Sequence, residues 1–344
     1  MKIRDFKIDA HSKPLMIAEE GQANQGDINI ALQMAKFALQ SGADGIEYQL
    51  FFADDMYAKY DPGHNLYKSR ELDKEEIKTL LEETHRIGLL VQVAGLSAKI
   101  IDLVAKIGTD VFIVNATDLN NPEIIDAVIS TNKPFWFSAL MAPLNEIDWA
   151  VEYVLSKNAK NFGILHGQHI LAAGCGVNSE NLQLGCIRLL ESRYNLPIGF
   201  VDHTSTKIVP ALAVGAGARL VTKHLKPHKD WTGPDSFICL DPHDWKDSKE
   251  IFDYSILAKG ESKNLSFDEL KDKSLAMRSI HTTRALRAGV EISRSDLIAL
   301  RPGSNGIPPL LIDSLIGKTL LMDIDENTQI LAGHIKGFKE KNWI

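Results

Sequence analysis

The stretches VDHTSTKIVP (201–210) and RLVTKHLKPH (219–228) share a pattern that indicates the fold. A short apolar run ends at His203 in the first stretch, and another ends at His224 in the second. The two runs follow one another as strand-like segments, so each would deliver an imidazole at the same relative position. Such a pair predicts neighbouring parallel strands whose carboxyl ends lie at one edge of a sheet.

Eight runs of this kind occur along the chain. Each is apolar almost throughout, which is typical of parallel strands covered on both faces. The runs are PLMIAE (14–19), GIEYQL (45–50), LLVQVAG (89–95), VFIVNA (111–116), PFWFSAL (134–140), FGILHG (162–167), IGFVDH (198–203) and RLVTKH (219–224).

The segments between these runs have helical periodicity and helix-end signals. Examples are 29–42, 73–88, 97–108 and 120–131, of which the first three end in a glycine, and a last helix is expected over about 240–258. Eight strand–helix alternations predict an α/β fold, a (β/α)8 TIM barrel. An open doubly wound sheet is the alternative, but no glycine-rich dinucleotide fingerprint follows the first run.

The chain changes character after the eighth run. We expect a barrel domain over 1–258, a polar linker with a short helix over 259–279, and a small β-rich domain over 280–344. The last segment mixes short strands with glycine turns and prolines.

Composition excludes several classes of protein. The formal net charge is −7 and basic residues are scattered, which argues against a nucleic-acid or membrane surface. Three distant cysteines indicate a reducing compartment without a disulfide framework. The polar N-terminus lacks a signal-peptide core, and no apolar window is long enough for a membrane span. A cytoplasmic protein is expected.

Polar side chains end the predicted strands, where the active sites of such barrels lie. His203 and His224 end neighbouring strands and could hold one Mn, Zn or Fe ion. Glu19 ends the first strand, next to the eighth in a closed barrel, and could orient a metal-bound water or act as a base. The alternatives are hydrogen-bonded histidines without a metal, and a structural carboxylate paired with Lys223.

Other polar residues near the strand ends are candidate substrate contacts. Asp235, in TGPDS, and Gln49 could bind sugar hydroxyls, although Asp235 could equally be a turn residue. Asp118 follows the fourth run, and Lys223 lies in KHLKPHK, whose cations could contact an anion or simply be solvated.

Five segments resemble the sialic acid synthases, including the pseudaminic and legionaminic acid synthases. They are IAEEGQANQGD, GADGIEYQLF, VDHT, KHLKPHKDWTGPDS and LRPGSNGIPPLLIDSLIGK. The similarity runs from about residue 14 to the end, and the last segment resembles an antifreeze-like (SAF) domain.

This resemblance implies a specific activity. The family condenses phosphoenolpyruvate with an N-acylmannosamine-type sugar to a nine-carbon 2-keto acid, using Mn or Mg held by two histidines. These match His203 and His224, and Glu19 matches the carboxylate that handles the reacting water. Gln49 and Asp235 match sugar contacts. Arg301 matches an arginine that the SAF domain delivers to the partner's barrel, which implies a domain-swapped homodimer.

The chain departs from the family pattern where phosphoenolpyruvate would bind. Glu47 stands where the family has a lysine, and 93–95, 113–118, the stretch HGQHILAAGCG and Val201 also differ. Lys226, His169 or Gln168 could rebuild an anion site. Two alternatives therefore stay open: a metal-dependent aldolase, lyase or isomerase that acts on a sugar acid without phosphoenolpyruvate, and a non-catalytic sugar-binding protein.

Overall fold

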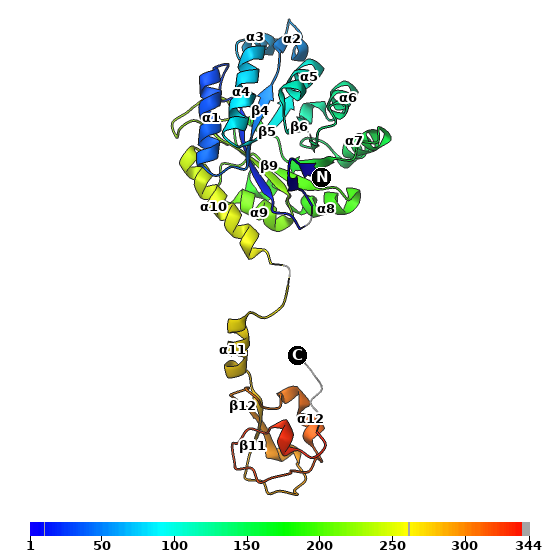
Figure 1. The fold of residues 1–344 in the computed structure, drawn as a ribbon, viewed down its shortest axis with the longest axis vertical. Helices are drawn as coiled ribbons and strands as arrows, with labels where there is room; N and C mark the ends of the chain where they lie inside the picture. Colours follow the sequence, from blue (N-terminus) through cyan, green and yellow to red (C-terminus); the bar gives the residue numbers. More distant parts are fainter. Residues whose placement is uncertain (10, 261, 339–344) are drawn as a thin grey trace. The chain divides into compact units, whose positions relative to one another are not determined.

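A computed structural model describes residues 1–9, 11–260 and 262–338 of the chain. The chain divides into two compact units, 1–260 and 261–344 (Figure 1).

The first unit contains a closed barrel of eight parallel strands, so the predicted TIM barrel is confirmed. The strands follow one another around the barrel in chain order, and β10 closes the ring against β3. They are β3 (Leu15–Gly21), β4 (Gly45–Leu50), β5 (Leu90–Gly95), β6 (Val111–Val114), β7 (Phe135–Ser138), β8 (Phe162–Gly167), β9 (Ile198–Asp202) and β10 (Leu220–His224). The fourth strand is two residues shorter than its apolar run, because the Asn115 side chain caps the short helix η1 (Ala116–Asp118).

Helices surround the barrel (Figure 1). They are α1 (Ile28–Gln40), α4 (Lys74–Arg86), α5 (Ala98–Ile107), α6 (Pro122–Ser130), α7 (Leu144–Ser156), α8 (Gly185–Tyr194), α9 (Val209–Ala216) and α10 (Pro242–Ala258), with shorter pieces α2 (Ala53–Met56), α3 (Pro62–Lys68), η2 (Leu171–Ala173) and η3 (Ser179–Asn181). Their starts follow the sequence signals: Asp73 and Glu76 form a capping box for α4, and Ser97 caps α5.

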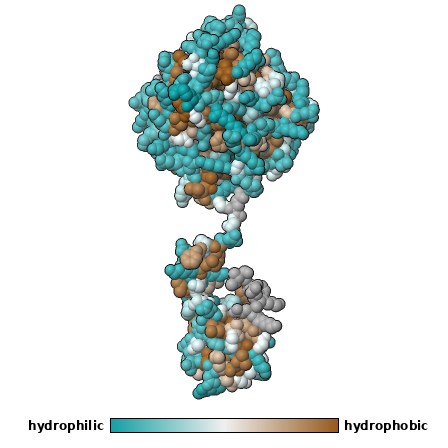
Figure 2. Space-filling view, viewed as in Figure 1, coloured by the Kyte–Doolittle hydropathy of each residue, from teal (hydrophilic) through white to brown (hydrophobic). Residues whose placement is uncertain are grey.

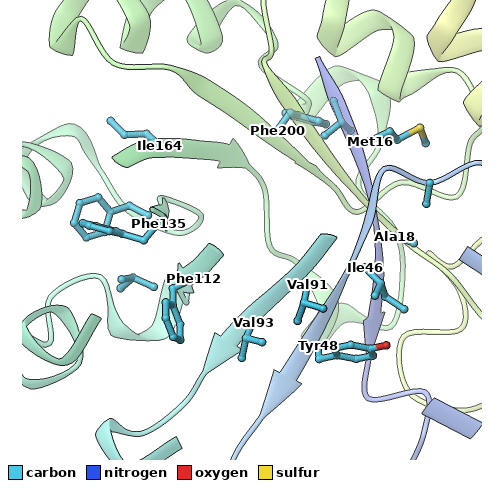
Figure 3. Packing of buried hydrophobic residues seen from close by; sticks show 14 of the residues in the cluster. Met16, Ala18, Ile46, Tyr48, Val91, Val93, Phe112, Phe135, Ile164 and Phe200 are labelled. Atoms are coloured by element: carbon cyan, nitrogen blue, oxygen red, sulfur yellow. The ribbon is translucent and has the colours of Figure 1, made fainter. Parts of the chain in front are cut away.

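Strand alternation separates the buried core into two layers. Met16 and Ala18 pack outward with the helices, whereas Leu15 and Ile17 point into the barrel and belong to a second cluster. Figure 3 shows side chains of the outer layer on successive strands, among them Tyr48.

A two-stranded hairpin, β1 (Lys2–Ile3) and β2 (Phe6–Lys7), precedes the barrel. Ile3 and Ile8 join the inner cluster with Leu15 and Leu220, which stand at the first positions of β3 and β10. The hairpin region therefore closes the amino-terminal end of the barrel, and the opposite end is left for chemistry.

The second unit has its own buried cluster, which includes Ile280, Ile307 and Ile330. Its elements are α11 (Phe267–Ala276), β11 (Ser279–Thr282), η4 (Arg294–Asp296), β12 (Leu297–Leu300), η5 (Pro309–Leu311), α12 (Ile312–Leu315) and η6 (Ala332–His334). β11 and β12 pair antiparallel, and isolated bridges join further segments, in keeping with the β-rich unit expected from the sequence. The predicted bounds 1–258, 259–279 and 280–344 stay predictions; α11 lies within the second range.

Hydrophilic residues dominate the visible face of the larger unit, and its hydrophobic patches are separate (Figure 2). Within the part of the chain that the structure describes, no helix has the length and apolar character needed to cross a membrane. The cytoplasmic location stays a prediction.

Candidate active site

The two histidines lie side by side at the carboxyl ends of β9 and β10. The strands pair in parallel, with Lys223 opposite Asp202, so the next residues, His224 and His203, also fall at one level. Their ring centroids are 5.2 Å apart, and both side chains are buried. The tertiary structure thus brings together the pair that the strand pattern predicts.

Burial favours the neutral form of both imidazoles, the form that binds metal ions. His203 Nδ1 lies 2.7 Å from the main-chain oxygen of Gln168, so this nitrogen donates and leaves Nε2 as the free acceptor. Burial lowers the pKa of His203 to about 4. Burial, followed by the charge of His203, also lowers the pKa of His224. A neutral imidazole nitrogen is a common metal ligand.

Glu19, inside the barrel on β3, completes the group. Its Oε2 lies 3.3 Å from His224 Nε2, and its Oε1 accepts a hydrogen bond of 3.1 Å from Gln49 Nε2. Burial, and then the charge of Glu47, raises the pKa of Glu19.

The donor set fits a metal ion. One ligand atom from each of Glu19, His203 and His224 lies within 4.8 Å of the other two. His224 Nε2 is buried without a hydrogen-bond partner among the described residues, because its approach to Glu19 lacks hydrogen-bond geometry. Two imidazoles and a carboxylate suit a transition-metal ion better than Mg or Ca.

A second group of possible ligands, Asp241, His243 and Asp244, lies at the start of α10. Lys207 Nζ is 3.0 Å from Asp244 and 2.9 Å from Asp247. One carboxylate of this surface group, that of Asp244, is therefore already paired with a lysine.

Two predicted substrate contacts lie near the buried group. Gln49 binds Glu19 directly. Asp235 is half-buried and has a left-handed φ of 56°. Its negative charge adds to the rise in the pKa of Glu19. Burial raises the pKa of Asp235, while His169 and Arg70 oppose this shift.

Three other predicted contacts lie elsewhere. Lys223 is fully buried and points outward into the helix layer, where it is 3.1 Å from Asp202 and donates to the Thr204 carbonyl. Asp118, in η1, accepts a hydrogen bond of 3.0 Å from Asn121 and lines a separate pocket formed with Tyr57 and Lys99.

Arg301 belongs to the second unit, where it is exposed just after β12.

Sequence reasoning missed two neighbours of the site. Gln92 is buried inside the barrel and donates a hydrogen bond of 2.6 Å to Glu47; a glutamine in the middle of the run LLVQVAG is the signal that could have found it. Arg70 binds Gln22 at 2.9 Å and lines a small pocket with Gln49. No pattern marks Arg70, because it comes from the loop between α3 and α4.

Comparison with known proteins places the chain in a family. The NeuB family model matches residues 34–263, and the SAF domain model matches residues 278–336. The chain is 30% identical to the N,N'-diacetyllegionaminic acid synthase of Legionella pneumophila over 93% of this chain and 94% of that protein. It is 23% identical to the pseudaminic acid synthase of Helicobacter pylori, over 94% and 98%.

Among solved structures, the N-acetylneuraminic acid (sialic acid) synthetase of Leptospira borgpetersenii superposes with a TM-score of 0.74 at 24% identity, over 79% of this chain and 94% of that one. At this identity the match supports the fold alone. The family models and the relatives together show that the chain belongs to the NeuB family of sialic acid synthases, as an enzyme of that synthase type with a C-terminal SAF domain.

Proposed function

We propose that this enzyme condenses phosphoenolpyruvate with an N-acylmannosamine-type amino sugar to give a nonulosonic acid, and that the reaction depends on a metal. The observation that carries the proposal is the buried group of Glu19, His203 and His224 at the strand ends. The names of the relatives, legionaminic and pseudaminic acid synthases, support this type of product.

The buried group would hold a divalent ion; the family resemblance implies manganese or magnesium, and of these two the imidazoles favour manganese. Such an ion polarises a carbonyl oxygen when it is bound. The neutral state of both imidazoles favours binding, because a protonated imidazole offers no lone pair.

Glu19 would move the proton of the reacting water. Burial raises its pKa, so the carboxylate accepts a proton more readily than an exposed glutamate. The hydrogen bond from Gln49 fixes one of its oxygens. In this reaction C3 of phosphoenolpyruvate bonds to the sugar aldehyde carbon, and water adds its oxygen to C2. The bond from C2 to the phosphate oxygen breaks as the C2 ketone forms. Of the two protons of the water, one ends on the aldehyde oxygen and the other on the released phosphate.

The remaining contacts would select the sugar and close the site. Gln49 and Asp235 would bind its hydroxyl groups. Arg301 of the partner subunit would reach the barrel from the SAF domain, so the active form would be a domain-swapped homodimer.

Calorimetry on the manganese-loaded protein tests the proposal. We expect saturable binding of phosphoenolpyruvate, and release of inorganic phosphate after N-acetylmannosamine is added. His203→Ala should lower manganese affinity at least about 100-fold, because one of two imidazoles is lost. His64→Gln is the control, because His64 is a buried histidine on α3 that pairs with Asp54 of α2 and does not belong to the metal group. Full manganese occupancy in His203→Ala would contradict the metal assignment.

One observation favours a second candidate, a metal-dependent aldolase, lyase or isomerase that acts without phosphoenolpyruvate. Glu47 places a carboxyl group inside the barrel. On the next two strands, β5 and β6, the apolar side chains of Ala94 and Ile113 line the barrel interior. Such a wall offers a phosphate no positive charge. Calorimetry separates the two functions: no heat with phosphoenolpyruvate, together with cleavage of a sugar acid by the same sample, would support the second.

A further inference from the structure

Glu47 is a buried carboxyl group that the proposed function does not use. It points into the barrel from β4, opposite Glu19 of β3 on one side and Gln92 of β5 on the other. The exposed fraction is 5% for Glu19 and Glu47 and 0% for Gln92. Two carboxyl groups and an amide therefore share the barrel interior, next to the histidine pair.

The charge of Glu47 has no partner. Its hydrogen bond is the one of 2.6 Å from Gln92 Nε2, and within residues 1–9, 11–260 and 262–338 it forms no ion pair. Buried charges in proteins are normally paired or bound to a metal, so this position lacks either a cation or a proton.

A second, independent observation points to the cation. Gln92 Oε1 is fully buried and has no hydrogen-bond partner among the described residues, although the other end of its amide holds Glu47. Gln92 lies one strand from Glu47 and two strands from Glu19 at the same level of the barrel, so its unused amide oxygen and the two carboxyl groups offer a set of oxygen acceptors. Such sets favour hard divalent cations such as Mg²⁺ and Mn²⁺, in contrast to the imidazoles of His203 and His224.

We infer that Glu47, Glu19 and Gln92 form a second divalent-cation site inside the barrel mouth, adjacent to the site of His203 and His224 and sharing Glu19 with it. The ion there supplies the positive charge that the carboxyl pair lacks. A bound cation would also offset the negative charge on the inner side of β4 and β5, so that an anionic substrate would no longer be repelled there. The second site rests on the proposed function only through the shared Glu19, and it requires no particular substrate.

The test counts Mn²⁺ ions bound to the full chain, by equilibrium dialysis and calorimetry without substrate. We expect about two ions per chain in the wild-type protein and about one in Glu47→Gln, which keeps the shape and removes the charge. Glu20→Gln is the matched control, because Glu20 is equally buried but points into the helix layer. It should keep about two ions. Electron paramagnetic resonance should show spin coupling between neighbouring Mn²⁺ ions in the wild type and not in Glu47→Gln.

An equal Mn²⁺ count in the wild-type protein and in Glu47→Gln would overturn the site and mean that Glu47 carries a proton instead, whereas a single wild-type ion that is lost in Glu47→Gln would keep this site and contradict the histidine site. Near-ultraviolet circular dichroism checks that each variant is folded. If Glu47→Gln does not fold, Glu47→Asp replaces it, with an expected loss of at least about tenfold in affinity for the second ion. Because no substrate is present, failure here leaves the proposed synthase activity untouched.

Discussion

Lys223 and His224 are consecutive residues with opposite surroundings. His224 points into the barrel beside Glu19, whereas Lys223 points into the helix layer, where both it and Asp202 are fully buried. Alternation along β10 explains the difference, since neighbouring side chains in a strand face opposite sides. Lys223 therefore contributes to the outer packing of the barrel, and its role as a substrate contact stays a prediction.

Replacing Lys223 should affect stability and leave metal binding intact. Lys223→Met leaves Asp202 as a buried, unpaired charge, so the free energy of unfolding should fall by roughly 3–5 kcal/mol. The double variant Lys223→Met/Asp202→Leu should recover most of this loss. Denaturant titration measures the stability, and calorimetry with Mn²⁺ measures the affinity. A large loss of affinity in the folded Lys223→Met variant would place the lysine at the site after all.

Glu20 should make the stability of the protein depend on pH. Burial raises its pKa to about 8, from 4.5. Between about pH 4.5 and 8 the folded state keeps a proton on Glu20 that the unfolded state has released. The free energy of unfolding therefore falls as the pH rises through this range, and the contribution of Glu20 is lost once the pH passes about 8. We expect wild type to lose on the order of a few kcal/mol relative to Glu20→Gln between about pH 5 and 8. Parallel stability curves of the two metal-free proteins would contradict this.

At the scale of elements, β8 depends on a glycine. A Cβ at Gly163 would lie 2.4 Å from Trp136 Cζ3 and 2.7 Å from the Pro197 carbonyl oxygen. Trp136 is completely buried inside the barrel, so it has little freedom to move away. The glycine thus makes room for the largest side chain of the barrel interior.

Gly163→Ala should destabilise the first unit by about 1–3 kcal/mol, because a methyl group overpacks a filled core. Gly215→Ala is the control with the same chemical change: Gly215 lies in α9, and nothing stands within 4 Å of its added Cβ. That variant should gain about 0.5–1 kcal/mol from better helix propensity. Thermal and denaturant unfolding of both variants distinguish the two effects; equal stability would rule out the packing role of Gly163.

At the scale of the whole molecule, the proposed domain swap makes one active site depend on two chains. Arg301→Ala chains and His203→Ala chains should each be inactive as homodimers and keep their circular dichroism. Once mixed and allowed to exchange subunits, they should recover roughly a quarter of wild-type activity, since half of the dimers carry one complete site. No recovery in samples proven to exchange would show that each chain completes its own site.

The sequence was informative where one local rule decides the structure. Apolar runs separated by helical periods predicted eight strands, and capping residues such as Asp73 and Ser97 marked helix starts. His203 and His224 could be paired because parallel neighbours in a barrel align their ends. Gln49 could be placed near Glu19 for the same reason. Asp118, a predicted substrate contact, lies in η1 and lines a different pocket, because the strand pattern does not encode the geometry of the loop after β6.

The barrel and the strand ends that bear the histidines could be predicted from the sequence, since periodicity and spacing are local properties of the chain. The folded structure was needed to show which side chains share a buried volume. It placed Glu47 beside Glu19 and Gln92, held His203 through the Gln168 carbonyl, and turned Lys223 toward Asp202. Desolvation and hydrogen bonding depend on neighbours that are distant in sequence, and these neighbours set the charge of each group at the site.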